Sequence, residues 1–211
     1  MDFGCGVGTW VRACLENGIT DVVGVDGDYV QDRSLVMPPD CFVRADLTQP
    51  LDLGRSFDVV ISLEVAEHLP PGAANTFVST LTRHAPVVLF SAAVPNQGGT
   101  HHTNEQWAEY WIERFGTCKY LCIDCVRPVF WEDSRINWWY RQNAFLFVAQ
   151  EFVSNNAALS KLADTKYVFP RSVVHPEFLN GLLTRHVKLS VLLQQTRRSI
   201  WNSLQYRLRR T

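Results

Sequence analysis

The chain has 211 residues, of which 46% are hydrophobic and 19% are charged, so it can bury a substantial core and is unlike a disordered polypeptide. No apolar run approaches the roughly 18 residues of a membrane-spanning helix, and the first residues lack the pattern of a secretion signal. With a formal net charge of -1 and six cysteines, the composition favours a cytoplasmic protein with reduced thiols.

The chain opens on a glycine-rich turn, DFGCGVG at residues 2–8, followed by a segment typical of a helix at 9–17. Alternating glycines let the backbone turn sharply and let a ligand approach without meeting a Cβ atom. The helix that follows offers unpaired N–H groups in its first turn. Because such a turn normally follows a buried strand, we expect a very short first strand here.

Short apolar runs, several of them ending in an acid, alternate with helical segments over the first half of the chain. This alternation predicts an α/β protein with helices on both faces of a parallel sheet. Ligands bind at the carboxyl ends of such strands, so the acids mark the expected site. The predicted strands are residues 21–26, 41–46, 57–62 and 86–92, and the predicted helices are residues 9–17, 29–36 and 71–84.

The second half continues with a predicted helix at 104–115. Two further predicted strands, at 120–126 and 144–149, form a closing pair for the sheet. We therefore place one domain at residues 1–150 and a helical, basic extension at residues 151–211.

The extension is helical in pattern from Leu179 to its end, with an apolar stripe between Leu189 and Leu208. Seven basic residues and no acid follow Glu177. A basic tail on an acidic body suggests contact with something anionic, such as a membrane surface, a nucleic acid or an acidic protein partner; the simpler alternative is a solvated helix face.

Four motifs, DFGCGVG, VVGVDGD, RADL and FDVVISLEVAEHLP, follow one another along the chain. As a set, and at this spacing, they resemble the class I S-adenosylmethionine-dependent methyltransferases. The resemblance covers about residues 2–150 and implies a Rossmann-like three-layer sandwich, a mostly parallel sheet with an antiparallel closing strand. Members normally carry one or two helices and a full first strand before the glycine turn, so the resemblance is to an N-terminally short member.

The resemblance also implies which residues hold S-adenosylmethionine. In this family the glycine turn contacts the methionine part, the acid after the second strand binds the ribose, and an Asp-Leu pair faces the adenine. Asp26 follows the turn by about 20 residues, a spacing that by itself favours a ribose contact. The corresponding residues of this chain are Asp2, Gly4, Gly6, Gly8, Asp26, Asp46 and Leu47.

The segment SLEVAEHLP at residues 62–70 ends a predicted strand and is expected to open a helix. On a helix, Glu64, Glu67 and His68 share one face. Two carboxylates and an imidazole on one face can bind a divalent cation, or can orient and deprotonate an attacking hydroxyl.

The E-x-x-E-H spacing is similar to that of ubiquinone-pathway O-methyltransferases and small-RNA 2′-O-methyltransferases, which use it to hold a metal. The latter add a histidine after the fifth strand, where this chain has His101 and His102 in a polar loop, VPNQGGTHHT. We favour a site without a metal, in which His68, His102 and Glu64, in that order, are the candidate bases.

The predicted reaction is methyl transfer from S-adenosylmethionine to an oxygen or nitrogen of a small molecule or glycan, because the catalytic half is acidic. One alternative is 2′-O-methylation of RNA with a metal at Glu64, Glu67, His68 and His102, although nucleic acid is the less favoured partner. The other alternative is a non-catalytic module that docks through its basic tail.

Two further patterns have simpler interpretations. Cys118, Cys122 and Cys125 match the spacing that holds an iron–sulfur cluster in radical S-adenosylmethionine enzymes, but Cys122 and Cys125 would point to opposite faces of a strand. The spacing is therefore interpreted as coincidence. The segment WEDSRINWWYRQN at 131–143 is too polar to be wholly buried, so some of its rings could face a sugar or a flat substrate, although core packing is favoured.

Overall fold

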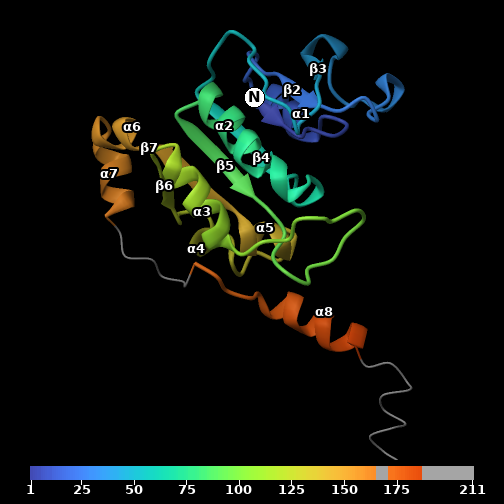
Figure 1. Ribbon diagram of the computed structural model, residues 1–211, viewed down its shortest axis with the longest axis vertical. Coiled ribbons are helices and arrows are strands. Elements are labelled where there is room, and N and C mark those ends of the chain that lie inside the picture. The colour runs from blue at the N-terminus through green and yellow to red at the C-terminus, as the bar shows by residue number, and fades with distance from the viewer. Residues whose placement is uncertain (165–170, 187–211) are drawn as a thin grey trace, which may run out of the picture. The chain divides into compact units, whose positions relative to one another are not determined.

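The computed structural model describes residues 1–164 and 171–186, and its central element is a seven-stranded sheet (Figure 1). The strands are β1 (Asp2–Phe3), β2 (Gly24–Asp26), β3 (Phe42–Arg44), β4 (Val59–Leu63), β5 (Val87–Ser91), β6 (Tyr120–Ile123) and β7 (Phe145–Ala149). Their order across the sheet is β3-β2-β1-β4-β5-β7-β6, and β7 runs antiparallel to both of its neighbours. The predicted α/β class, mostly parallel with an antiparallel closing strand, is confirmed.

Helices flank the sheet, and α2 and α3 pack against each other over β5 and β6 (Figure 1). The helices are α1 (Thr9–Glu16), α2 (Ala74–His84), α3 (Ala108–Thr117), α4 (Arg127–Phe130), α5 (Trp138–Asn143), α6 (Gln150–Ser154), α7 (Ala157–Ala163) and α8 (Pro176–His186). Four short 3-10 turns, η1 (Asp32–Ser34), η2 (Pro39–Cys41), η3 (Ala66–His68) and η4 (Pro71–Ala73), complete the described elements.

The helix predicted at residues 29–36 is wrong, because this segment is a loop whose regular part is the single turn η1. Two local features oppose a helix there. The Ser34 hydroxyl donates to the Gln31 carbonyl at 2.6 Å, which offers the backbone an alternative to helical bonding. Pro38 and Pro39 follow directly, and a proline disfavours helical backbone in the residue before it.

The very short β1 is confirmed, and it is paired on both sides. Asp2 lies opposite Gly24 of β2 and Ile61 of β4, so the two-residue strand occupies the centre of the sheet. The side chain of Phe3 is fully buried, as is that of its β2 partner Val25. The residues that follow β1 therefore emerge at the middle of the carboxyl edge of the sheet, where ligands of open α/β sheets bind.

Beyond the closing strand, α6 contacts β7 and α7 contacts β6, so residues up to Ala163 pack on the sheet. A second compact unit begins at Val174 and contains α8. The predicted apolar stripe between Leu189 and Leu208 lies outside the described residues. Within the part that is described, no helix combines the length and the apolar character needed to cross a bilayer.

Candidate functional site

The glycine turn forms a left-handed backbone at the carboxyl end of β1. Gly4, Gly6 and Gly8 have φ angles of 89°, 53° and 91°, which side chains rarely tolerate. A Cβ on Gly4 would lie 2.4 Å from Val65, and one on Gly8 would lie 2.5 Å from Met37, so both positions are filled by packing. Nothing lies within 4 Å of a Cβ built on Gly6, so this glycine keeps space open for a ligand.

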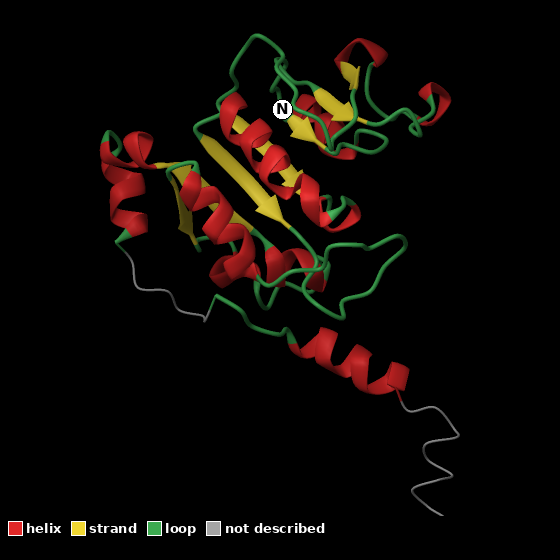
Figure 2. Cartoon of the chain, viewed as in Figure 1, coloured by secondary structure: helices red, strands yellow, loops and turns green. Residues whose placement is uncertain are grey.

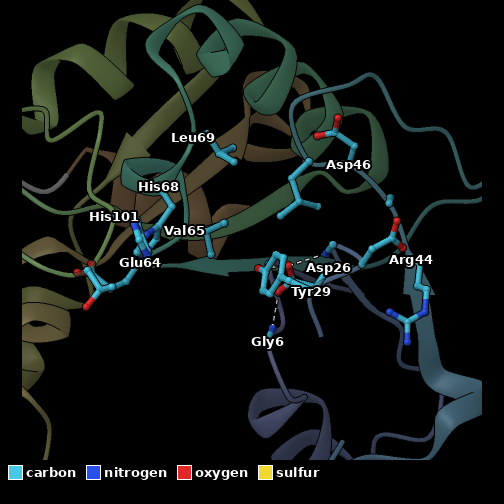
Figure 3. Close-up of a pocket in the computed structure, with 16 residues that line it drawn as sticks. Gly6, Asp26, Tyr29, Arg44, Asp46, Glu64, Val65, His68, Leu69 and His101 are labelled. Atoms are coloured by element: carbon cyan, nitrogen blue, oxygen red, sulfur yellow. Dashed lines mark hydrogen bonds between the residues drawn. The ribbon is translucent and has the colours of Figure 1, made fainter. Parts of the chain in front are cut away.

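Asp26, at the carboxyl end of β2, is hydrogen bonded to the glycine turn. The N–H of Gly6 donates to Oδ2 at 2.6 Å, and the N–H of Gly27 donates to Oδ1 at 2.7 Å. The hydroxyl of Tyr29 also donates to Oδ1, from a side chain that is 76% exposed (Figure 3). The buried carboxylate is thus held by backbone donors, while the third donor is a solvent-exposed side chain that can move away.

A cavity of about 910 Å³ joins this region to the segment after β4. Gly6, Asp26 and Tyr29 lie at one part of it, and His68 and His101 lie at another (Figure 3). Its volume is near the upper end of the usual range for a small-molecule site, roughly 300–1,000 Å³. The other lining residues are Gly4, Gly27, Asp28, Arg44, Ala45, Asp46, Leu47, Glu64, Val65, Leu69 and Thr100.

Asp46 and Leu47 line the cavity in different ways. Leu47 is buried and presents an apolar wall, whereas Asp46 is exposed. The Asp46 carboxylate caps its own turn, because Oδ1 accepts from the N–H and the hydroxyl of Thr48 at 2.9 and 2.7 Å. These bonds lower the pKa of Asp46.

Asp2 lies beneath the turn rather than in the wall of the cavity. Its side chain is 4% exposed, and its Oδ2 has no hydrogen-bond partner among the described residues. Burial raises the pKa of Asp2 to about 7. The N-terminal ammonium of Met1 lowers the pKa of Asp2, but by less than burial raises it.

Glu64 does not lie on a helix with Glu67 and His68, so the predicted shared helical face is wrong. Glu64 has a φ of 55°, which ends β4 without starting a helix, and only the 3-10 turn η3 follows. Its carboxylate accepts from Gln97 at 2.7 Å and from Asn143 at 3.2 Å. These partners come from the loop after β5 and from the end of α5, which the E-x-x-E-H pattern cannot reveal.

Glu67, His68 and His102 nevertheless come together in space. One ligand atom from each lies within 4.8 Å of the others, and the two imidazole rings meet edge to face with centroids 4.8 Å apart. Glu67 is fully buried, and neither of its carboxylate oxygens has a hydrogen-bond partner among the described residues. Burial, and then the charge of Glu64, raise the pKa of Glu67 to about 9. Burial and the neighbouring His102 lower the pKa of His68.

The loop between β5 and α3, green in Figure 2, carries His101 and His102 to this cluster. It is attached to the turn η3 by two backbone bonds, in which the N–H groups of Thr103 and Asn104 donate to the Glu67 carbonyl at 2.8 and 3.0 Å. His101 has a φ of 62° and lines the cavity. The structure therefore gathers His68, His101 and His102, as the sequence-based interpretation expects, but through a loop rather than a helical face.

The sequence analysis did not identify three residues that lie near the site: Tyr29, Glu105 and Asn143. Tyr29 bonds the ribose-binding candidate Asp26, Glu105 bonds His102, and Asn143 bonds Glu64. Tyr29 and Glu105 lie three residues from their partners, so local spacing could have indicated them. Asn143 is 79 residues from Glu64, and no sequence signal connects them.

Packing explains the cysteine pattern, whereas the rings expected to be in the core, Trp131, Trp138, Trp139 and Tyr140, are only partly buried. Cys122 packs with the main core and Cys125 with the cluster around Ile123 and Val153, so the two side chains belong to different cores. None of the six cysteines, all of which lie in the described residues, forms a disulfide. Trp10 of α1 meets Tyr140 of α5 edge to face with centroids 6.1 Å apart, and Trp10 is 41% exposed.

The fold and the site together define an open α/β domain with a cavity at the carboxyl edge of its sheet, where ligands of such folds bind. Residues 1–147 match a family model described as "Methyltransferase domain". The chain therefore belongs to the methyltransferase-domain family, and the sequence-based resemblance to methyltransferase enzymes is confirmed at this level.

Solved structures support the same fold. The sugar N-methyltransferase KedS8 from Streptoalloteichus sp ATCC 53650 has 16% identity and a TM-score of 0.53, over 70% of this chain and 78% of that one. LepI in complex with SAM has 13% identity and a TM-score of 0.51, over 71% of this chain. The match covers 42% of the LepI chain. No curated protein matches the sequence.

Proposed function

We propose that this chain transfers a methyl group from S-adenosylmethionine to an oxygen or nitrogen of a small molecule or glycan. The observation that carries the proposal is the single cavity that connects Gly6 and Asp26 to His68. It combines a glycine turn, a strand-end carboxylate and an imidazole at the edge of the sheet where ligands bind.

The residues present fit the cofactor. The open position beside Gly6 admits a ligand, and Gly4 and Gly6 line the cavity where the methionine part would lie. Asp26 would take the ribose, with Tyr29 giving up its hydrogen bond, and Leu47 would face the adenine beside Asp46. When bound, S-adenosylmethionine supplies an activated methyl group on a sulfonium, so the protein contributes mainly proximity, alignment and a dry site.

His68 is the proposed base. It lines the cavity, and its lowered pKa keeps the imidazole neutral and able to accept a proton at neutral pH. Glu64 is less suited to this role, because Gln97 and Asn143 occupy its carboxylate and burial raises its pKa. We assign Glu64 to orienting the β5–α3 loop and His102 to supporting His68.

The test has two stages. Calorimetric titration with S-adenosylhomocysteine should give saturable binding to the full chain, and Asp26→Ala should weaken it. Labelled S-adenosylmethionine is then offered with a panel of amino sugars, hydroxylated aromatics and a short RNA. Label transferred to a sugar or an aromatic supports the proposal, whereas cofactor binding with transfer to RNA alone would contradict the proposed substrate class.

A metal-assisted reaction on RNA is the second candidate, and the cluster of Glu67, His68 and His102 favours it. The carboxylate of Glu67 is buried without a partner, and His102 meets Glu105, as metal-bound histidines usually meet a carboxylate. The sequence-based alternative included Glu64, which is not part of this cluster. If a cation is required, a chelator should abolish methyl transfer and Mg²⁺ or Mn²⁺ should restore it. Methyl transfer at an unchanged rate in the presence of the chelator would exclude the metal-assisted reaction.

The basic tail supports a third candidate, docking to an anionic membrane or a protein partner without catalysis. Its bases from Lys188 onward lie outside the described residues, so this stays a prediction from sequence. Removing residues 187–211 should abolish sedimentation with phosphatidylserine vesicles if the tail docks to membranes. If the full-length chain does not sediment with these vesicles, membrane docking is contradicted.

A further inference from the structure

Glu105, which the proposed reaction does not use, accepts three hydrogen bonds at the end of the β5–α3 loop. Its Oε2 accepts from the N–H of Asn96 at 2.8 Å, and its Oε1 accepts from the N–H of Gly98 at 2.7 Å. The same Oε1 lies 2.9 Å from Nδ1 of His102. The two side chains are 19% and 11% exposed, so water competes little for these contacts. The orientation of the Glu105 carboxylate is therefore fixed by the backbone N–H groups of the loop.

The geometry determines which ring nitrogen of His102 carries the proton. An ionised carboxylate only accepts hydrogen bonds, and both backbone partners of Glu105 are donors. The Nδ1 of His102 must therefore donate to Oε1, which leaves the lone pair of the neutral ring on Nε2.

Gly99 preserves the position of this ring. A Cβ atom on Gly99 would lie 2.2 Å from Nε2 of His102, a distance that forces the ring to move. Only a glycine at 99 therefore lets His102 reach Glu105 in this orientation. On its other side the ring meets His68 edge to face.

We propose that Glu105 is a positioning residue that holds His102 in the Nδ1-protonated tautomer and so places a proton-accepting Nε2 in the cluster with His68. Glu105 acts through His102, and Gly99 provides the space. The consequence for catalysis rests on the proposed function, because the tautomer affects turnover only if His68 is the base or a ligand of the reacting site. The tautomer itself can be measured without any acceptor or cofactor.

The experiment is long-range ¹H–¹⁵N correlation spectroscopy of the full chain labelled with ¹⁵N-histidine, at a pH where the ring is neutral. The His102 signals are assigned from their loss in His102→Gln. The wild-type spectrum should show the Nδ1-protonated pattern. Glu105→Leu should shift the tautomer ratio by about 10-fold or more, since a hydrogen bond to a charged group is worth about 1.5–3 kcal/mol.

Two further variants separate positioning from general loop damage. Glu105→Gln loses the bond from the Asn96 N–H but keeps an oxygen that can accept from Gly98 and from Nδ1 of His102, so it should retain the Nδ1-protonated pattern. Gly99→Ala leaves Glu105 intact but displaces the ring, and should reproduce the pattern of Glu105→Leu. An Nε2-protonated His102 in the wild type overturns the proposal even if Glu105→Leu fails to fold, and so does an unchanged tautomer in a folded Glu105→Leu. Failure to bind S-adenosylhomocysteine would contradict the proposed function and leave this result untouched.

Discussion

Two buried acids, Asp26 on the glycine-turn side of the site and Glu67 on the histidine side, differ in how they are compensated. On the glycine-turn side, Asp26 accepts from Gly6, Gly27 and Tyr29. On the histidine side, Glu67 is buried with no hydrogen-bond partner among the described residues. A satisfied carboxylate fixes the shape of a binding surface, whereas an unsatisfied one is costly to bury and is found where a site has a charge to meet. Under the proposed function, the glycine-turn side would hold the cofactor and the histidine side would carry the chemistry.

The largest expected effect tests the assignment of chemistry to the histidine side. His68→Ala should lower kcat for methyl transfer about 100- to 10,000-fold, the usual contribution of a positioned base. Binding of S-adenosylhomocysteine should stay within a few fold, since His68 is not among the residues proposed to hold the cofactor. His101→Ala is the matched control, because His101 lines the same cavity and should cost less than about 10-fold. Equal losses in both variants would show that His68 is not the base.

The next effect tests the assignment of recognition to the glycine-turn side. Asp26→Ala removes a carboxylate that bonds the turn and is proposed to bind the ribose, so affinity for S-adenosylhomocysteine should fall about 100-fold. Asp28→Ala, an exposed acid in the same cavity wall, should change affinity little. Calorimetry measures both. Unchanged affinity in Asp26→Ala would mean that the ribose is bound elsewhere.

The burial of Glu67 is tested by the pH dependence of stability. The pKa of Glu67 is about 9 in the folded chain and near 4.5 when unfolded, so the folded state holds an extra proton between these values. The free energy of unfolding contributed by Glu67 therefore falls as pH rises from about 4.5 to about 9. Glu67→Gln removes this slope and should be more stable than the wild type by about 1–3 kcal/mol at pH 8, with no gain near pH 4.

Urea denaturation at pH 4, 6 and 8 measures this difference. Glu113→Gln, an exposed acid on α3, is the control and should follow the wild type at each pH. If the profiles of the wild type and Glu67→Gln run parallel, Glu67 is ionised in the folded chain and has a compensating partner.

The smallest expected effect tests whether Gly8 serves packing and Gly6 serves cofactor binding. Gly8→Ala puts a Cβ against Met37 at a φ of 91°, and should destabilise the chain by about 1–2 kcal/mol. Gly6→Ala meets no atom within 4 Å, so it should cost stability less and should weaken cofactor binding instead. Thermal melts and calorimetry separate the two. Loss of binding in Gly8→Ala without loss of stability would reverse the division.

The amino-acid sequence by itself determined the α/β class, the strand order along the chain and the glycine-turn side of the site. Gly4, Gly6 and Asp26 were predictable because the turn and the next strand end lie close in sequence, and a left-handed backbone requires glycine. The positions predicted for strands β2 to β5 agree with the structure, because buried parallel strands are continuous apolar runs.

Only the tertiary structure decided the arrangement of the histidine side. Glu64 was expected on a helical face, but Asn143 and Gln97 hold it at a strand end, because a buried carboxylate must find donors wherever the fold brings them. The pairing of His102 with Glu105 depends on a loop closed by backbone N–H groups and on the missing Cβ of Gly99. Side-chain periodicity describes helices and strands, and it carries no information about how a loop folds back on a turn. The glycine-turn side was therefore predictable from local spacing, while the histidine side was set by contacts between distant segments.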